Sequence, residues 1–351
     1  MMILGCAMVW GADDTITYDN AKALGMGNAR IAGGFNYNGF VDNPALLSRV
    51  RYVRFSIVNI PIGVNDDLVD MSKFIEDNSN NFADFDSLSI QEKQAFLDDI
   101  EEYDSKWGRL NVAPMIDVAA NIMGFGVGLA VFNTTDVALK VDKGIYEPRV
   151  WGEGRSNIAV VIGMAKPVFM LYPGLTLGMN IKFLERRKAS LFQVPASDLG
   201  NISDTIKPIT DEVKNDTNKH IALDFGALLD LPLIGTEVGA TLQSIGDGRG
   251  ASLDLGVAKR MWDDRLTLLA DYIDFLDNNR ENVFSKIHFG AELNAMPFAL
   301  RAGISKGYPA LGLGLNFQVI DIDAAYYTEE LSKGPGGNDE GRYVVQVKVG
   351  W

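Results

Sequence analysis

The segment Leu175-Thr-Leu-Gly-Met-Asn-Ile-Lys-Phe183 alternates large apolar side chains with small or polar ones. Because successive side chains of a β-strand point to opposite faces, this pattern predicts a strand with one apolar face and one polar or small face. A membrane-spanning helix is excluded, because no run of this sequence approaches the roughly 20 consecutive apolar residues that such a helix needs.

The same alternation recurs at 219–229, 284–294, 309–317 and 319–328. Together with less regular segments it predicts about fourteen strands, most of them near the roughly 9 to 11 residues of a tilted strand that crosses a bilayer. The predicted strands are 51–61, 109–121, 124–133, 156–165, 174–186, 219–229, 235–245, 251–259, 265–274, 284–294, 297–305, 309–317, 319–328 and 342–351.

The connections between these strands alternate in length. Long ones are predicted at 62–108, 134–155 and 187–218, and tight ones include 122–123 and 295–296. A soluble β-sandwich shares the alternation within strands, but the even strand number and the unequal connections favour an all-β, transmembrane antiparallel β-barrel with long extracellular loops and short periplasmic turns. A closed barrel also leaves no sheet edge exposed.

A barrel in lipid has an apolar outer face, so certain side chains should contact lipid. The residues expected there include Leu175, Leu177, Met179, Leu311, Leu313 and Leu315. The glycines between them should tolerate small polar replacements.

The last strand carries the most specific local pattern. Its alternate positions are Tyr343, Val345, Val347, Val349 and Trp351. This resembles the terminal aromatic signal by which bacterial outer-membrane barrels are recognised and inserted. The resemblance implies the bacterial outer membrane, contact with its lipid, and the barrel-assembly machinery as a partner during insertion.

The N-terminal part has a different composition. Residues 23–34 are rich in glycine and alanine, and Asn43-Pro44-Ala45 follows. Segments rich in Gly and Pro are poor barrel strands. Here the chain resembles the FadL-like outer-membrane barrels, which begin with a Gly-rich hatch that plugs the lumen and carries an Asn-Pro-Ala motif. The resemblance implies a hatch over 13–50, with Asn43, Pro44 and Ala45 as its motif, and a barrel over 51–351.

Two further stretches, 60–70 and 88–97, resemble the conjugal-transfer TraF-like branch of that superfamily, to which PorV-type barrels are related. A thioredoxin-like role is excluded, because Cys6 is the only cysteine and a redox pair needs two. Residues 1–12 end in small residues and are predicted to be the remnant of an export signal, with an N-terminal core strand as the alternative.

The first long loop contains Ser89-Ile-Gln-Glu92, a capping box, followed by apolar residues at helical spacing. We therefore predict a helix within extracellular loop 62–108. A second helical candidate spans 203–214 in loop 187–218, although Pro208 weakens it. The first loop is strongly acidic but lacks EF-hand spacing, which favours a solvated surface over a calcium site.

Composition and motifs argue against several classes of function. The formal charge of -14 disfavours nucleic acid as a partner. The chain lacks the HExxH, GxSxG and P-loop motifs, so no enzyme activity, cofactor or metal is predicted. The polar faces of the strands instead suggest residues that line the lumen. These candidates are His220, Asp224, Asp271, Lys286, His288, Glu292, Arg301 and Lys348. Arg301, Lys286 and Lys348 are the cations that could hold a carboxylate.

Two functions stay open at this stage. In the first, which is slightly favoured, the resemblance to FadL implies passage of small hydrophobic molecules, with the hatch moving to release them. In the second, the barrel is a closed platform whose loops bind a surface or secreted protein, as PorV-type barrels do.

Overall fold

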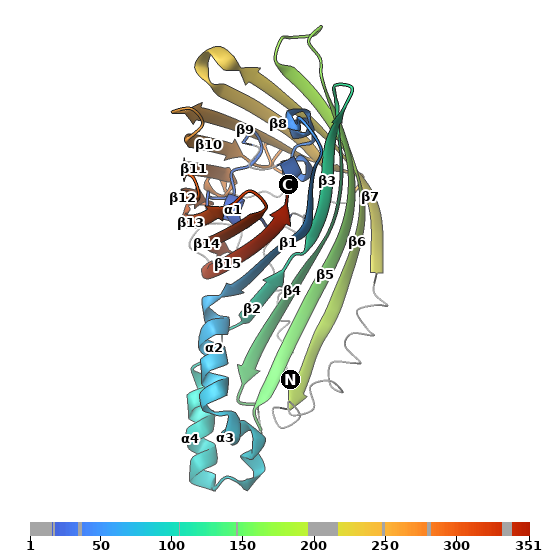
Figure 1. Ribbon diagram of the computed structural model, residues 1–351. Coiled ribbons are helices and arrows are strands. Elements are labelled where there is room, and N and C mark those ends of the chain that lie inside the picture. The colour runs from blue at the N-terminus through green and yellow to red at the C-terminus, as the bar shows by residue number, and fades with distance from the viewer. Residues whose placement is uncertain are drawn as a thin grey trace.

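The computed structural model describes residues 16, 18–33, 37–104, 106–144, 147–195, 217–247, 250–278, 282–331 and 339–351. Within these ranges the strands form one antiparallel sheet that closes on itself, because β15 pairs with β1 (Figure 1). The predicted signal remnant 1–12 and the helical candidate 203–214 lie outside the described residues.

The strands follow one another around the ring in sequence order, except that β2 and β3 share one place, each paired with both β1 and β4. They are β1 (Arg54–Asn65), β2 (Gly108–Val112), β3 (Met115–Ile122), β4 (Phe125–Asp142), β5 (Arg149–Pro167), β6 (Leu175–Pro195), β7 (Thr217–Leu231), β8 (Thr236–Ile245), β9 (Ser252–Met261), β10 (Leu266–Tyr272), β11 (Ile287–Ala295), β12 (Phe298–Ser305), β13 (Tyr308–Asn316), β14 (Ile320–Glu330) and β15 (Asp339–Gly350). Short 3-10 helices, η5 (Pro232–Ile234) and η6 (Val283–Lys286), lie in two connections.

The barrel fold is confirmed, and each of the fourteen predicted strands is present. The segment 109–121 is divided into β2 and β3 at Ala113-Pro114. Pro114 has no N–H to donate to a ladder, and opposite it the register against β1 jumps from Ile62↔Val112 to Ser56↔Asp117. This break is the reason for fifteen strands where the alternation predicts fourteen.

The predicted bounds of the long loops are wrong because several strands continue into them. β4, β5 and β6 have 18, 19 and 21 residues, and β1 continues to Asn65. The predicted connections 62–108, 134–155 and 187–218 shrink accordingly. Beyond a bilayer both faces of a strand meet water, so the apolar alternation that marks a strand fades although the ladder continues.

We call the end of the barrel that carries the tight turns the turn end, and the opposite end the loop end. At the loop end, β1 leads into a helical projection that extends away from the barrel (Figure 1). It consists of α2 (Asp66–Asp77), α3 (Ser79–Ala83), η3 (Phe85–Ser87) and α4 (Ile90–Glu101).

The helix predicted from the capping box is α4. Ser89 N–H donates to Glu92 Oε2 over 2.9 Å, and Glu92 N–H donates to Ser89 Oγ over 3.4 Å. Phe96 and Ile100 are buried in a small core that includes Met71 and the ends of two strands, at Val141 of β4 and Val150 of β5. In the described part of the chain, every helix is too short or too polar to cross a membrane.

The two faces of the barrel wall differ as expected for a protein in lipid. Leu311 and Leu313 are 61% and 60% exposed on the outside, and Leu177 is also exposed. On the inside, Asn180 and Asp224 are fully buried. This is the reverse of a soluble protein, so the outer face is solvated by lipid.

The segment before β1 lies inside the ring of strands. It contains α1 (Ala21–Leu24), which lies beside β13–β15, and the 3-10 helices η1 (Tyr37–Val41) and η2 (Pro44–Arg49), the latter against β4–β7 (Figure 1). We call residues 16–50 of the described chain the hatch. Its apolar side chains, among them Met26, Phe40 and Leu47, are buried against the wall.

Candidate functional site

The Asn-Pro-Ala motif fixes the hatch to itself and to the wall. Asn43 has extended backbone geometry before Pro44, and its side-chain oxygen accepts a hydrogen bond from Ala45 N–H over 3.1 Å, which caps η2. Its amide nitrogen donates to Ile31 O over 2.9 Å and to Ala227 O in β7 over 3.4 Å. The fully buried Asn43 therefore joins two hatch segments to one strand.

Glycines on the inner face of the wall make room for this motif. A Cβ added to Gly178 would lie 2.5 Å from the backbone nitrogen of Ala45, and one added to Gly226 would overlap Asn43 Oδ1. A Cβ on Gly312 would lie 3.1 Å from the Cα atom of Gly25. Gly178 and Gly312, which lie between the predicted lipid-facing residues, therefore have little room for even a small side chain, because their missing side chains are what lets the hatch approach.

Polar side chains of the wall bind the hatch backbone. Asp271 accepts hydrogen bonds from the N–H groups of Arg30 and Ile31, and His288 Nδ1 lies 2.8 Å from Gly27 O. Asn180 donates to Phe40 O over 2.8 Å. These bonds satisfy backbone groups that are buried inside the lumen, where an unpaired group is costly.

A chain of charges links hatch and wall. Lys22 of α1 lies 3.0 Å from Glu292, which also accepts from Arg301 over 2.7 Å, and Arg301 donates to Asp323 over 2.6 Å. The Arg301 side chain is fully buried. The expectation that Arg301 could hold a ligand carboxylate is therefore wrong, because two wall carboxylates already occupy its guanidinium.

The other predicted lumen cations are paired as well. Lys286 donates to Asp277 over 2.5 Å and lies 3.6 Å from Asp274, and Lys348 lies 3.9 Å from Asp321. They stabilise the wall and are not positioned as a trap for a carboxylate.

Two further predicted lumen residues, Asp224 and His220, lie on the inner face of β7. Asp224 is buried, lies 2.6 Å from Lys182 and accepts from Ser244 N–H over 2.9 Å. His220 lies on the same face of β7, four residues nearer the loop end, and is half-buried. Among the described residues, no three His, Cys, Asp or Glu side chains are grouped as metal ligands would be.

The C-terminal pattern lies at the seam of the barrel. Tyr343, Val345 and Val347 are exposed on the outer face, between buried Val344 and Gln346. At the seam, Phe55 and Trp351 exchange two backbone hydrogen bonds of 2.9 and 3.0 Å, and their ring centroids lie 4.3 Å apart.

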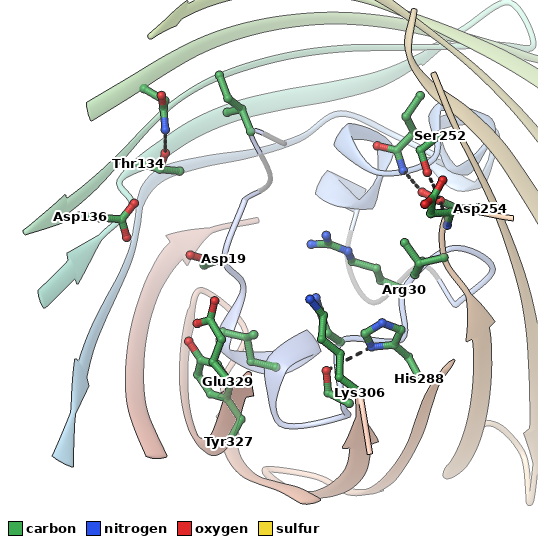
Figure 2. A pocket seen from close by; sticks show the side chains of 18 of the residues that line it. Asp19, Arg30, Thr134, Asp136, Ser252, Asp254, His288, Lys306, Tyr327 and Glu329 are labelled. Carbon is green, nitrogen blue, oxygen red and sulfur yellow. Dashed lines mark hydrogen bonds between the residues drawn. The ribbon is translucent and has the colours of Figure 1, made fainter. Parts of the chain in front are cut away.

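Above the hatch, on the loop side, lies a cavity of about 350 Å³. The hatch contributes Ile16, Leu24 and Ile31 to its lining, all three largely buried. Charged side chains from the strands, among them Asp136 and Asp254, also line it (Figure 2). The sequence patterns did not indicate this cavity.

Two charged residues of the cavity come from segments without alternation. Asp19 precedes α1, and Lys306 lies in the turn between β12 and β13 (Figure 2). Burial raises the pKa of Asp19 from its usual range to about 7; the carboxylates of Asp136 and Glu329 add to this shift, and Arg30 and Arg342 oppose it. An ionisable residue directly before the Gly-rich segment was the available sequence signal for Asp19.

Solved structures of similar shape are known. The toluene transporter TodX of Pseudomonas putida aligns with a TM-score of 0.57 and 12% identity, over 98% of this chain and 99% of that chain. The toluene transporter TbuX of Ralstonia pickettii aligns with 0.55 and 13%, over 95% of this chain and 98% of that chain. Both are FadL-family transporters. The fold is that of a FadL-like barrel.

Sequence comparisons add nothing to this structural similarity. No family model matches the chain, and no curated protein matches it significantly. A structural match at 12–13% identity shows the fold of the FadL-like barrel alone.

Proposed function

We propose that this FadL-like barrel resides in the bacterial outer membrane and mediates passage of small hydrophobic molecules, with the hatch as its gate. The observation that carries the proposal is the position of the hatch, which lies in the lumen below the cavity and is held there by hydrogen bonds, ion pairs and packing. A molecule entering from the loop end reaches the cavity and can continue only if the hatch moves.

Two observations support this proposal. TodX, which shares the fold, is described as a monoaromatic hydrocarbon channel. The hatch itself contributes Ile16, Leu24 and Ile31 to the lining of the cavity, so a bound molecule would lie against the element that has to move.

Uptake of toluene into liposomes containing the purified protein tests the proposal. Deletion of residues 20–40, or Asn43→Ala, removes bonds that hold the hatch but leaves the strand ladders intact, so the barrel should still insert while toluene entry changes. Asn80→Ala on α3, an exposed asparagine outside the lumen, is the matched control. Different migration of boiled and unboiled protein reports folding. Unchanged uptake by folded hatch variants would contradict the transport proposal.

A second candidate function is a platform for a protein partner, in line with the TraF-like and PorV-type resemblance. The helical projection favours it, because residues 66–107 extend beyond the barrel, pack against the loop ends of its strands, and carry thirteen Asp or Glu against three Lys (Figure 1). Mass spectrometry of lipids and proteins retained after gentle detergent extraction separates the two functions. A platform should lose a bound protein when 66–107 is replaced by a short linker, without any change in toluene uptake.

We also propose that Tyr343, Val345, Val347, Val349 and Trp351 act as the signal for insertion by the barrel-assembly machinery. Their outward position and the pairing of Trp351 with Phe55 at the seam support this role. Removal of Trp351 should lower the fraction of the chain recovered as folded barrel in the outer membrane. An unchanged fraction would contradict it.

A further inference from the structure

Two charged side chains that open into the cavity have no partner. Within the part of the chain that the structure describes, Asp19 and Lys306 make neither a hydrogen bond nor an ion pair. Both are half-buried. An unpaired charge in such a place loses part of its hydration without compensation, so a ligand of opposite charge would stabilise it there.

Neighbouring charges of the cavity are satisfied within the protein. Asp254 accepts from Ser252, Gln243 and the backbone N–H of Asp274. Across the cavity, Asp136 accepts from Arg155 over 2.7 Å. Glu329 is likewise paired with Arg342. Asp254, Asp136 and Glu329 therefore each have hydrogen-bond or ion-pair partners within the protein, whereas Asp19 and Lys306 have neither among the described residues.

The positions of Asp19 and Lys306 are set by the backbone. Lys306 (φ +53) and Gly307 (φ +90) form the two-residue turn between β12 and β13, and the Lys306 side chain reaches over the lumen from this turn. Asp19 lies on the hatch, held in place by Tyr18, which is buried beside Phe132. Figure 2 shows Asp19 and Glu329 on one side of the cavity, and Lys306, His288 and Arg30 on the other.

We propose that the ligand of this cavity is a zwitterion with an apolar body, whose carboxylate lies at Lys306 and whose ammonium lies at Asp19. This inference rests on the proposed transport function and narrows its substrate to an amphiphilic molecule, so toluene serves in the uptake experiment as a probe of passage past the hatch and not as the best ligand of the cavity. The cavity of about 350 Å³ falls in the range of small-molecule sites, and the apolar body would lie toward the hatch, which contributes Ile16, Leu24 and Ile31 to the lining.

The arrangement also excludes poorer ligands. An anion would leave Asp19 unpaired and close to its own negative charge, and a cation would do the same to Lys306. A neutral hydrocarbon would cover both groups and satisfy neither, at the cost of desolvating them. Only a ligand with both charges compensates both side chains.

A series of probes on one benzene ring tests the proposal: toluene, phenylacetate, phenethylamine and phenylalanine. Calorimetric titration into the full chain in detergent should give phenylalanine the highest affinity, about 10-fold or more above either singly charged probe. Asp19→Asn and Lys306→Gln should each remove most of that advantage. Asp77→Asn and Lys73→Gln on exposed positions of α2 are the matched controls and should change nothing.

The outcomes separate this inference from the proposed function. Equal affinity for all four probes, or a phenylalanine affinity that Asp19→Asn and Lys306→Gln leave unchanged, overturns the zwitterion proposal, while toluene uptake into liposomes would still support transport. Absence of both binding and uptake in protein that retains heat-modifiable migration overturns both. Tighter binding of phenylacetate that only Lys306→Gln weakens would overturn the zwitterion in favour of a plain anion.

Discussion

Strand β6 passes two different compartments on one face. Near the turn end its inward positions are Gly178 and Asn180, where the hatch backbone approaches the wall. Nearer the loop end the inward positions are Lys182, Leu184, Arg186 and Lys188, of which the last two line the cavity. The inward side chains of one strand therefore change with the compartment they face. Gly178 and Asn180 let the hatch backbone approach the wall, and the long charged Arg186 and Lys188 line the open cavity.

The largest expected effect comes from the buried charges on the hatch side. Arg301→Met should lower the free energy of unfolding by about 3–5 kcal/mol, because Glu292 and Asp323 would be left buried without their partner. Urea unfolding in lipid vesicles measures it. Lys143→Met breaks a pair with Glu101 that is exposed on both sides, and should leave the free energy of unfolding nearly unchanged. Equal costs for the two variants would mean that the lumen is as wet as the outer surface.

The next prediction tests the assignment of the outer face of the barrel to lipid. Leu313→Arg, in the middle of β13, should cost about 2–4 kcal/mol, because a guanidinium would be placed in the hydrocarbon of the bilayer. Leu233→Arg in η5 at the turn end should cost about 0–1 kcal/mol, since charge near the interface is tolerated. The same unfolding measurement compares them. Similar costs would contradict the assignment of the outer face to lipid.

The docking of the hatch against small residues gives a smaller effect. Gly226→Ala should cost about 1–3 kcal/mol and loosen the hatch, because the added methyl overlaps Asn43 Oδ1 and Pro44. Gly63→Ala in β1 is the control, since its nearest neighbours would lie 3.6 Å away. Limited proteolysis of the hatch should therefore speed up in the first variant alone. Equal protection in both would mean that the wall yields to the hatch.

The barrel was predictable from the sequence because the outer face of each strand meets lipid and the inner face meets polar groups. This difference acts on every residue of a strand and produces the alternation. The prediction failed where that difference ends: beyond residue 133, β4 continues with Thr135, Asp136 and Lys140, whose polarity resembles a loop. In the projection, α4 was predictable from the Ser89 capping box. The helix α2 was missed, although Asn65 accepts a hydrogen bond from Leu68 N–H as its N-cap.

The site was predictable only in part. Alternation indicates that Asp271 and Glu292 face inward, and they do. Their partners could not be predicted, because the contacts join residues far apart in sequence. The bond from Ala21 N–H to Gln346, for example, spans 325 positions. Residues outside strands, such as Asp19 and Lys306, have no alternation from which their direction can be inferred.

The smallest expected effect concerns the boundary between hatch and cavity, where Asp19 lies. Its pKa is raised from 3.8 to about 7, so between these values the folded protein binds more protons than the unfolded chain. Stability from this group is therefore present below about pH 4 and is lost as the pH rises through about 7. Hydrogen exchange of the hatch amides should accordingly be slower at pH 5 than at pH 8, after correction for intrinsic rates. Asp19→Asn should flatten this difference, because the amide carries no titrating proton, whereas Asp77→Asn on α2 should keep it. An unaltered pH dependence in Asp19→Asn would mean that a different group titrates. The stability of the hatch would then not depend on the charge of Asp19 in the cavity.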